Sequence, residues 1–135
     1  MKRHIWTMIA ALALSFQLSL AEKKVPLQNT ATVPAAEGRA ILDQDENGNL
    51  EIKIEVRHLA KPEQLTPAKQ VYVVWIQPSG EQPQNAGALK VNDELKGEFK
   101  ARTPYKNLDV FVTAEDSATA TTPAGPEVLR QHLQK

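Results

Sequence analysis

The sequence predicts an all-β protein, an antiparallel Ig-like β-sandwich of six to seven short strands that follows an N-terminal signal peptide. Apolar residues alternate with polar ones over short runs, which is typical of half-buried strands. These runs recur at intervals of roughly 8–12 residues, with proline, glycine or Asn-Gly between them. A chain of 135 residues has room for one domain.

Residues 1–21 have the pattern of a secretory signal peptide. A basic start, Met1–His4, precedes the uncharged run Ile5–Leu20, and small side chains stand at Ser19 and Ala21. This is the order of a basic region, an apolar region and a cleavage site. We therefore expect a periplasmic or secreted protein of the bacterial envelope. An uncleaved segment would instead anchor the chain in the membrane.

The strands are expected in residues 37–135, after a flexible N-terminal segment at 22–36 that could itself hold a first strand over Ala31–Pro34. Strict alternation over 50–57 predicts a strand with one face in the core and one in water. The uninterrupted β-branched and aromatic run 71–76 predicts a central strand that is buried on both faces. Further strands are expected near 38–42, 86–91, 94–101, 108–114 and 127–133, the last of which could instead form a short helical tail.

Charge and cysteine content exclude several classes of function. The chain has 16 basic and 16 acidic residues, and removal of 1–21, with Lys2 and Arg3, leaves 14 basic against 16 acidic residues. The sequence has no cluster of positive charge of the kind that binds nucleic acid, so a nucleic-acid partner is not expected. Since there is no cysteine, disulfides, thiolate zinc sites and a cysteine nucleophile are excluded.

The segment 43–48 reads Asp-x-Asp-x-Asn-Gly, which matches the start of a calcium-binding loop. The position that should hold a bidentate glutamate is Ile54, so a plain Asn-Gly hairpin with solvated acids is the favoured interpretation. Calcium is the one cofactor that the sequence suggests. Its candidate ligands are Asp43, Asp45, Asn47 and Glu51.

Few other residues could carry chemistry. Ser79 and Ser117 lack the glycine context of a nucleophile elbow, so a non-enzymatic protein is predicted. His58 and His132 could bind a transition metal together with Glu55, but lone histidines in a β domain are more often surface residues.

Three aromatic residues are candidates for contact with a partner, namely Tyr72, Trp75 and Tyr105. Tyr72 and Trp75 are three residues apart on one strand, so they should lie on opposite faces. One of them could line a groove, although a place in the core is favoured for Trp75 because large aromatic residues are few.

Several motifs in series characterise residues 71–129. A Tyr72-x-x-Trp75 strand is followed by a glycine-bearing turn and by Gly87-Ala88-Leu89. A strand then ends at Thr113-Ala114-Glu115, and a Pro-x-Gly-Pro loop follows at 123–126. This series resembles the C-terminal extracytoplasmic domain of anti-sigma-K-type factors.

The resemblance implies a β-sandwich sensory or interaction module outside the cytoplasmic membrane. Such factors also carry a cytoplasmic sigma-binding domain and a membrane span, for which no matching residues are found here, so this chain is not expected to sequester a sigma factor itself. The function predicted is a binding or structural role in the envelope, with a protein or an envelope polymer as partner. The alternatives are a calcium-stabilised extracellular module using Asp43–Glu51, and a membrane-anchored regulator of an extracytoplasmic sigma factor pathway.

Overall fold

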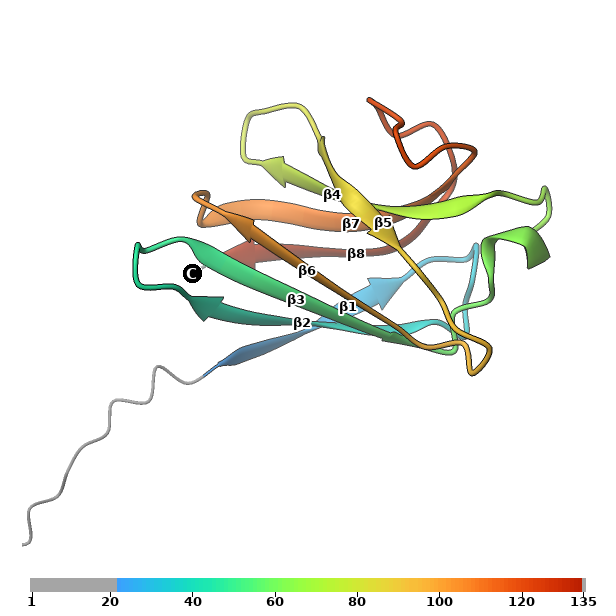
Figure 1. Cartoon of the computed structure of the whole chain (residues 1–135), viewed down its shortest axis with the longest axis horizontal. Helices are drawn as coiled ribbons and strands as arrows, with labels where there is room; N and C mark the ends of the chain where they lie inside the picture. Colours follow the sequence, from blue (N-terminus) through green and yellow to red (C-terminus); the bar gives the residue numbers. More distant parts are fainter. Residues whose placement is uncertain (1–21, 135) are drawn as a thin grey trace, which may run out of the picture.

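The computed structural model describes residues 22–134. The predicted signal peptide and Lys135 lie outside this range. Within it the chain forms eight strands and one turn of 3₁₀ helix, Pro62–Gln64 (Figure 1). The strands are β1 (Lys23–Asn29), β2 (Glu37–Gln44), β3 (Leu50–Arg57), β4 (Val71–Pro78), β5 (Gln84–Leu89), β6 (Gly97–Thr103), β7 (Asn107–Glu115) and β8 (Glu127–Gln134).

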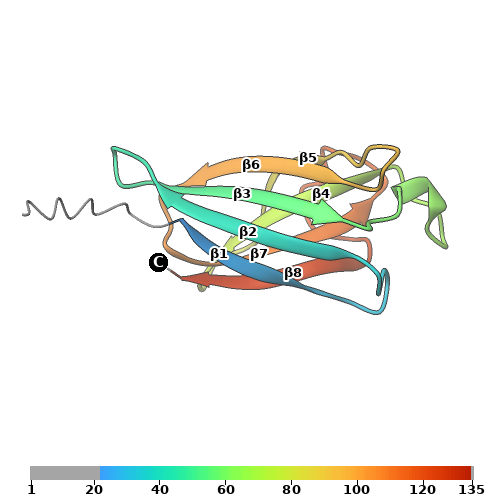
Figure 2. The ribbon, with the colours of Figure 1, turned by 90° about the horizontal axis from the view of Figure 1, so that it is seen from below.

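All eight strands belong to one antiparallel sheet in the order β5-β4-β7-β8-β1-β2-β3-β6. The sheet rolls up so that its two edge strands, β5 and β6, lie beside each other, and its shape approaches a closed barrel (Figure 2). The predicted all-β antiparallel class is confirmed. The strand count is eight, where six to seven were predicted.

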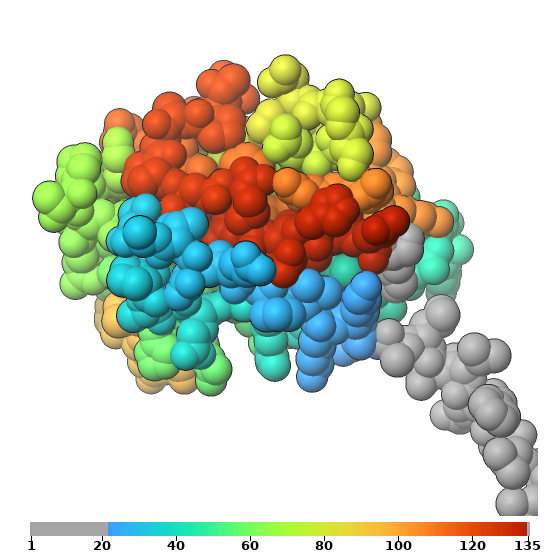
Figure 3. Space-filling view, turned by 180° about the vertical axis from the view of Figure 1, so that it is seen from behind, coloured from blue at the N-terminus to red at the C-terminus, as the bar shows by residue number. Residues whose placement is uncertain are grey.

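The additional strand, β1, lies in the segment 22–36, which was predicted to be flexible. It pairs with β2 from Lys23 to Leu27 and with β8 through Gln28 and Asn29, so that it joins the two halves of the sheet (Figure 3). Its alternation is too short to be recognised, and Pro26 argues against a central strand. The backbone N–H of Thr30 points toward β8, because it donates to the carbonyl of Val128. Backbone direction alternates along a strand, so the nitrogen of Pro26 also points toward β8 and away from β2. The ladder between β1 and β2 therefore loses no hydrogen bond at this proline.

The interior of the rolled sheet is filled by the inward row of each strand. The predicted inner row of β3 is buried, with each of its four apolar side chains at most 2% exposed. The strand β4 is paired on both sides, with β5 and β7, and residues 72–76 of the predicted run 71–76 are buried on both faces of the sheet, while Val71 is half-buried. Tyr72 belongs to the main core, whereas Trp75 belongs to a second cluster with Val73 and Phe111.

The second cluster lies under the segment between β7 and β8. Ala120 packs against it, and the Asn85 side-chain amide donates hydrogen bonds to the carbonyls of Ala118 and Ala120 at 2.9 and 2.8 Å. This segment thus serves as a lid on the outer face of β4 and β7. No helix in residues 22–134 is both long enough and apolar enough to cross a membrane.

Candidate functional site

The predicted Asn-Gly hairpin connects β2 and β3. Gly48 has φ +81°, a conformation that favours glycine, and its N–H donates to the carbonyl of Asp45 at 3.1 Å. The N–H of Asp45 in turn donates to the carbonyl of Asn49 at 2.9 Å. The turn therefore fixes the register of the two strands whose outward side chains build the charged face described below.

Asp45 uses its carboxylate to shape this turn. Oδ1 accepts hydrogen bonds from the backbone N–H groups of Asn47 and Asn49, at 2.9 and 2.8 Å. Oδ2 lies 3.2 Å from Nε of Arg102. Burial raises the pKa of Asp45, but the hydrogen bonds from Asn49 and Asn47 and the charge of Arg102 outweigh it and hold that pKa below its usual value.

The other predicted calcium ligands are separated by their roles. Asp43 and Glu51 are register partners on the outer face, and Glu51 accepts a hydrogen bond from Arg102 Nη2 at 2.7 Å. Asn47 is exposed at the tip of the turn. In the part of the chain that the structure describes, no group of three or more His, Asp or Glu side chains is arranged to hold a metal ion.

His58 and His132, the two histidines of residues 22–134, lie on different elements of the fold. His58 is exposed just after β3, in the left-handed conformation with φ 54°. His132 lies on β8, where Nδ1 is 2.7 Å from Oδ1 of Asp109. Glu55, the carboxylate that was considered with them, instead accepts a hydrogen bond from Nε of Arg39 at 2.7 Å.

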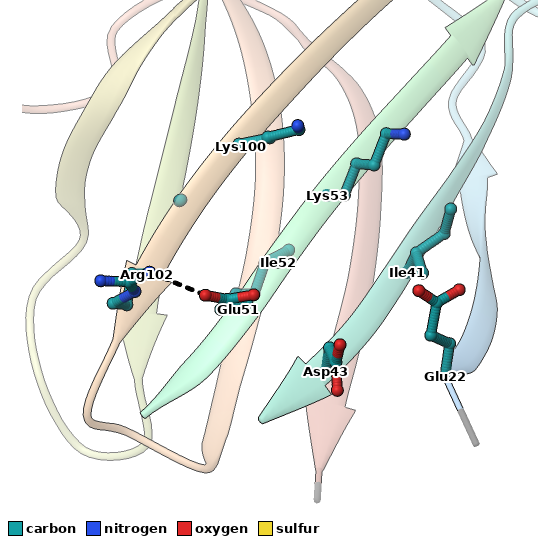
Figure 4. A pocket seen from close by; sticks show the side chains of 9 residues that line it. Glu22, Ile41, Asp43, Glu51, Ile52, Lys53, Lys100 and Arg102 are labelled. Carbon is teal, nitrogen blue, oxygen red and sulfur yellow. Dashed lines mark hydrogen bonds and ion pairs between the residues drawn. The ribbon is translucent and has the colours of Figure 1, made fainter. Parts of the chain in front are cut away.

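The outer face of β1, β2, β3 and β6, called here the charged face, has a hollow of about 570 Å³ (Figure 4). Asp43, Glu51 and Glu22 lie toward the hairpin end of this hollow, and Lys53 and Lys100 extend at its other end. The half-buried Ile41, on β2, is the register partner of Lys53. The hollow is thus lined by carboxylates, by the cationic groups of Lys53, Lys100 and Arg102, and by the apolar residues Ile41, Ile52 and Ala101.

Rows of charge cross the face because the strands are in register. Lys53 lies 3.3 Å from Glu55 on its own strand and 3.5 Å from Glu98 on β6. These carboxylates raise the pKa of Lys53, and the Arg39 hydrogen bond lowers the pKa of Glu55. Lys53 and Glu55 therefore stay charged at neutral pH, which suits binding of a charged surface better than proton transfer, because a general acid or base works best with a pKa near the operating pH.

Two of the three predicted contact residues are buried, so the structure corrects that prediction. Tyr72 and Trp75 have no exposed surface. The hydroxyl of Tyr72 donates to the carbonyl of Ala60 at 2.5 Å, and Nε1 of Trp75 donates to Oγ1 of Thr113 at 2.7 Å. Their opposite faces were predicted correctly, but the β7–β8 segment covers the outer face that Trp75 occupies.

Tyr105 is the third candidate, and it is 36% exposed. It borders a second hollow, of about 280 Å³, between β5 and the end of β6, together with Ala86 and Ala101. It therefore stays a candidate for contact with a partner.

A buried polar network beside Trp75 could not be predicted. Glu115 is only 3% exposed; its Oε2 accepts hydrogen bonds from the hydroxyl of Thr113 at 2.5 Å and from the N–H of Gly125 at 3.0 Å. Ala124 donates to the same carboxylate. A glutamate at the end of a strand is usually exposed. The backbone N–H donors, on Ala124 and Gly125, lie in a segment without periodicity. The network holds the lid in place.

The chain matches no known family model, no curated protein and no solved structure. The resemblance to anti-sigma-K-type factors accordingly stays a prediction drawn from the residues.

Proposed function

We propose that the chain is an exported, non-enzymatic domain of the Ig-like β-sandwich type that binds a partner in the cell envelope, in a role similar to the sensory domain of anti-sigma-K factors. The observation that carries this proposal is the charged face with its hollow, which Ile41 helps to line (Figure 4). The partner is a protein, or an envelope polymer, that itself carries charges of both signs.

The charged face supports binding because its side chains are already ordered by contacts with one another. Arg102 bonds to Glu51 and lies beside Asp45, and Lys53 lies between two carboxylates. A surface that is ordered before it binds loses little conformational entropy when a partner arrives. Complementary charge then determines the orientation and the rate of association more than the affinity.

Export supports an envelope location for this binding. Residues 1–21 carry the sequence pattern of a signal peptide, and the chain has no cysteine, so its folding needs no oxidant. The charged face would then meet proteins and polymers outside the cytoplasm.

Site-specific photo-crosslinking in the native envelope tests the proposal. A photoreactive amino acid replaces Ile41, which lines the hollow of the charged face, and in a matched strain it replaces Gln82, which is exposed in the β4–β5 loop. We expect a discrete adduct from position 41 and none of the same mass from position 82. Adding Lys53→Ala should weaken the position-41 adduct, whereas Lys90→Ala, on an exposed residue after β5, should leave it unchanged.

Identical adduct patterns from positions 41 and 82 would contradict the proposal. So would an adduct at position 41 that is insensitive to Lys53→Ala, since the charged row of Lys53 would then play no part in binding. Thermal unfolding of each variant shows whether the fold is kept, which separates loss of binding from loss of structure.

A further inference from the structure

The strand β6 ends the sheet on one side and has an open edge. Its ladder with β3 runs over seven residue pairs, from Val56 with Gly97 to Leu50 with Thr103. Among the described strands, only β3 is hydrogen-bonded to it. An edge strand of this length presents a row of free backbone donors and acceptors, which is a template for another strand.

The direction of these free groups follows from the hydrogen bonds of the neighbouring ladder. The N–H of Asp45 bonds to the carbonyl of Asn49, in register with the β2–β3 pairs. Successive residues of an antiparallel strand bond to opposite sides, so the even-numbered residues of β3 bond to β6. They pair with odd-numbered residues of β6. The backbone N–H and C=O groups of Glu98, Lys100 and Arg102 therefore point out of the open edge.

The neighbouring edge strand β5 makes no backbone hydrogen bond with these groups. A Cβ on Gly87 of β5 would lie 3.1 Å from the ring of Phe99, and a Cβ on Gly97 would lie 2.5 Å from the carbonyl oxygen of Lys90. Gly97 and Phe99 belong to the inward row of β6, because they pair with the buried Val56 and Ile54. The end of β5 thus packs across the inner side of β6, and among the described residues no backbone hydrogen bond joins the two strands.

The sequence of β6 complements itself in antiparallel pairing. When Gly97 is opposite Thr103 of a second copy, the two strands overlap over their whole length, and Glu98 is opposite Arg102 of the second copy. The same contact occurs twice, once on each side of the two-fold axis. In this register Glu98 of one copy lies opposite Arg102 of the other, and Lys100 lies opposite Lys100. The outward backbone groups of all three residues are then hydrogen-bonded across the interface.

We infer that β6 pairs with β6 of a second copy, so that this open edge is the interface of a symmetric dimer. The occupant is a second copy because the two outer charges of the strand are of opposite sign and meet in the full-length register. Lys100 lies on the two-fold axis, where its counterpart repels it; its side chain is 73% exposed and lies 4.0 Å from Glu98 of its own strand, which offsets part of this repulsion.

Pairing of this kind would join the two charged faces. A two-fold axis perpendicular to the sheet keeps the same face of both copies on one side, so β1-β2-β3-β6 would continue into β6-β3-β2-β1 of the second copy. Lys100 and Arg102, which line the hollow of each copy, would bring the two hollows side by side. The dimer would therefore present one continuous charged surface with two binding hollows.

The molar mass in solution, measured by light scattering over a wide range of concentrations, tests the interface. We expect the full chain to reach twice its monomer mass as concentration rises. Lys100→Pro should keep it monomeric, because the N–H of residue 100 points out of the edge and proline removes it without breaking the ladder to β3. Lys100→Ala retains the N–H and removes the like-charge contact, so it should dimerise at lower concentration than the wild type.

Charge reversal gives the sharpest form of the test. Glu98→Arg alone and Arg102→Glu alone each place like charges opposite one another, and each should be monomeric. An equimolar mixture of the two variants restores both opposite-charge contacts, so it should form a heterodimer, which native mass spectrometry identifies by its mass. A variant damaged in folding gains nothing from mixing, so restoration cannot come from a general structural effect.

A full chain that stays monomeric at every concentration would overturn the inference and would leave Lys100 as a residue that protects the edge from pairing. A dimer that persists in Lys100→Pro, or charge variants that dimerise alone as well as mixed, would also overturn it. The crosslinking experiment at Ile41 reports on a different partner, so the two proposals fail separately.

Discussion

Thr113 links two parts of the structure through one hydroxyl group. It accepts a hydrogen bond from the indole N–H of Trp75 at 2.7 Å and donates one to Glu115 at 2.5 Å. Thr113 is 2% exposed and Glu115 3%. A buried donor that loses its only acceptor keeps its full desolvation penalty.

We expect Thr113→Val to destabilise the protein by about 1–3 kcal/mol, because Trp75 Nε1 loses its acceptor and Glu115 loses a donor while the volume is kept. The measurement is the free energy of unfolding in urea. Thr119→Val is the matched control, since the hydroxyl of Thr119 is exposed and bonds to Ser117; it should change stability by less than about 0.5 kcal/mol. Equal losses in the two variants would show that the network contributes nothing.

At the scale of single residues, the sequence predicted which face of a strand a side chain occupies better than whether that face is covered. Period two placed Tyr72 and Trp75 on opposite faces, which the two core clusters confirm. It could not show that the outer face would be covered, because the covering segment between β7 and β8 has no periodicity. Its attachment depends on Asn85 and Glu115, which are distant from it in the chain or look exposed by type.

At the scale of elements, the β2–β3 hairpin was the most predictable unit. Its turn residues and its alternating strand are local signals, and both are present as predicted. The strand β1 was not predictable, because its seven residues include Pro26 and it is held by partners distant in sequence, on β2 and β8. The calcium prediction depended on local spacing alone. Local spacing does not show which other residues form hydrogen bonds with the same carboxylate oxygens.

We expect calcium to leave the unfolding temperature of the protein unchanged. Asp45 Oδ1 is occupied by two backbone N–H groups and Glu51 by Arg102, so a cation would have to displace these contacts. The measurement is thermal unfolding in millimolar calcium and in chelator. A site filled at 100 times its dissociation constant would add about 2.7 kcal/mol. A rise in midpoint that Asp43→Asn abolishes would instead establish calcium as a ligand of this loop.

At the scale of the whole molecule, the fold class followed from alternation, but the closure of the sheet did not. The joint between β1 and β8 has only two register pairs, between segments at opposite ends of the described chain. No local pattern specifies such a contact. The charged face has the same origin, since the register of β2, β3 and β6 brings together acids and bases that lie far apart in sequence.

The charged face predicts how the stability of the molecule depends on pH. The pKa values of Glu55 and Asp45 are both lowered, Glu55 by its hydrogen bond from Arg39 and Asp45 by backbone hydrogen bonds that outweigh its burial. A carboxyl group whose pKa is lower in the folded state stabilises the fold above its unfolded value, which is 3.8 for Asp45 and 4.5 for Glu55, and this contribution is lost as pH falls through the lowered value.

We therefore expect the unfolding temperature to be steady near neutral pH and to fall as the pH drops below about 4.5, where the unfolded chain begins to bind protons that the folded chain does not. Glu55→Gln should reduce the steepness of this fall, because residue 55 then takes up no proton on unfolding. Glu46→Gln, on the exposed tip of the hairpin, should retain more of the wild-type slope. High salt should flatten the wild-type profile, since exposed ion pairs are screened. An unfolding temperature that rises on acidification would mean that repulsion among the carboxylates, and not their pairing with Arg39 and Lys53, dominates the charged face.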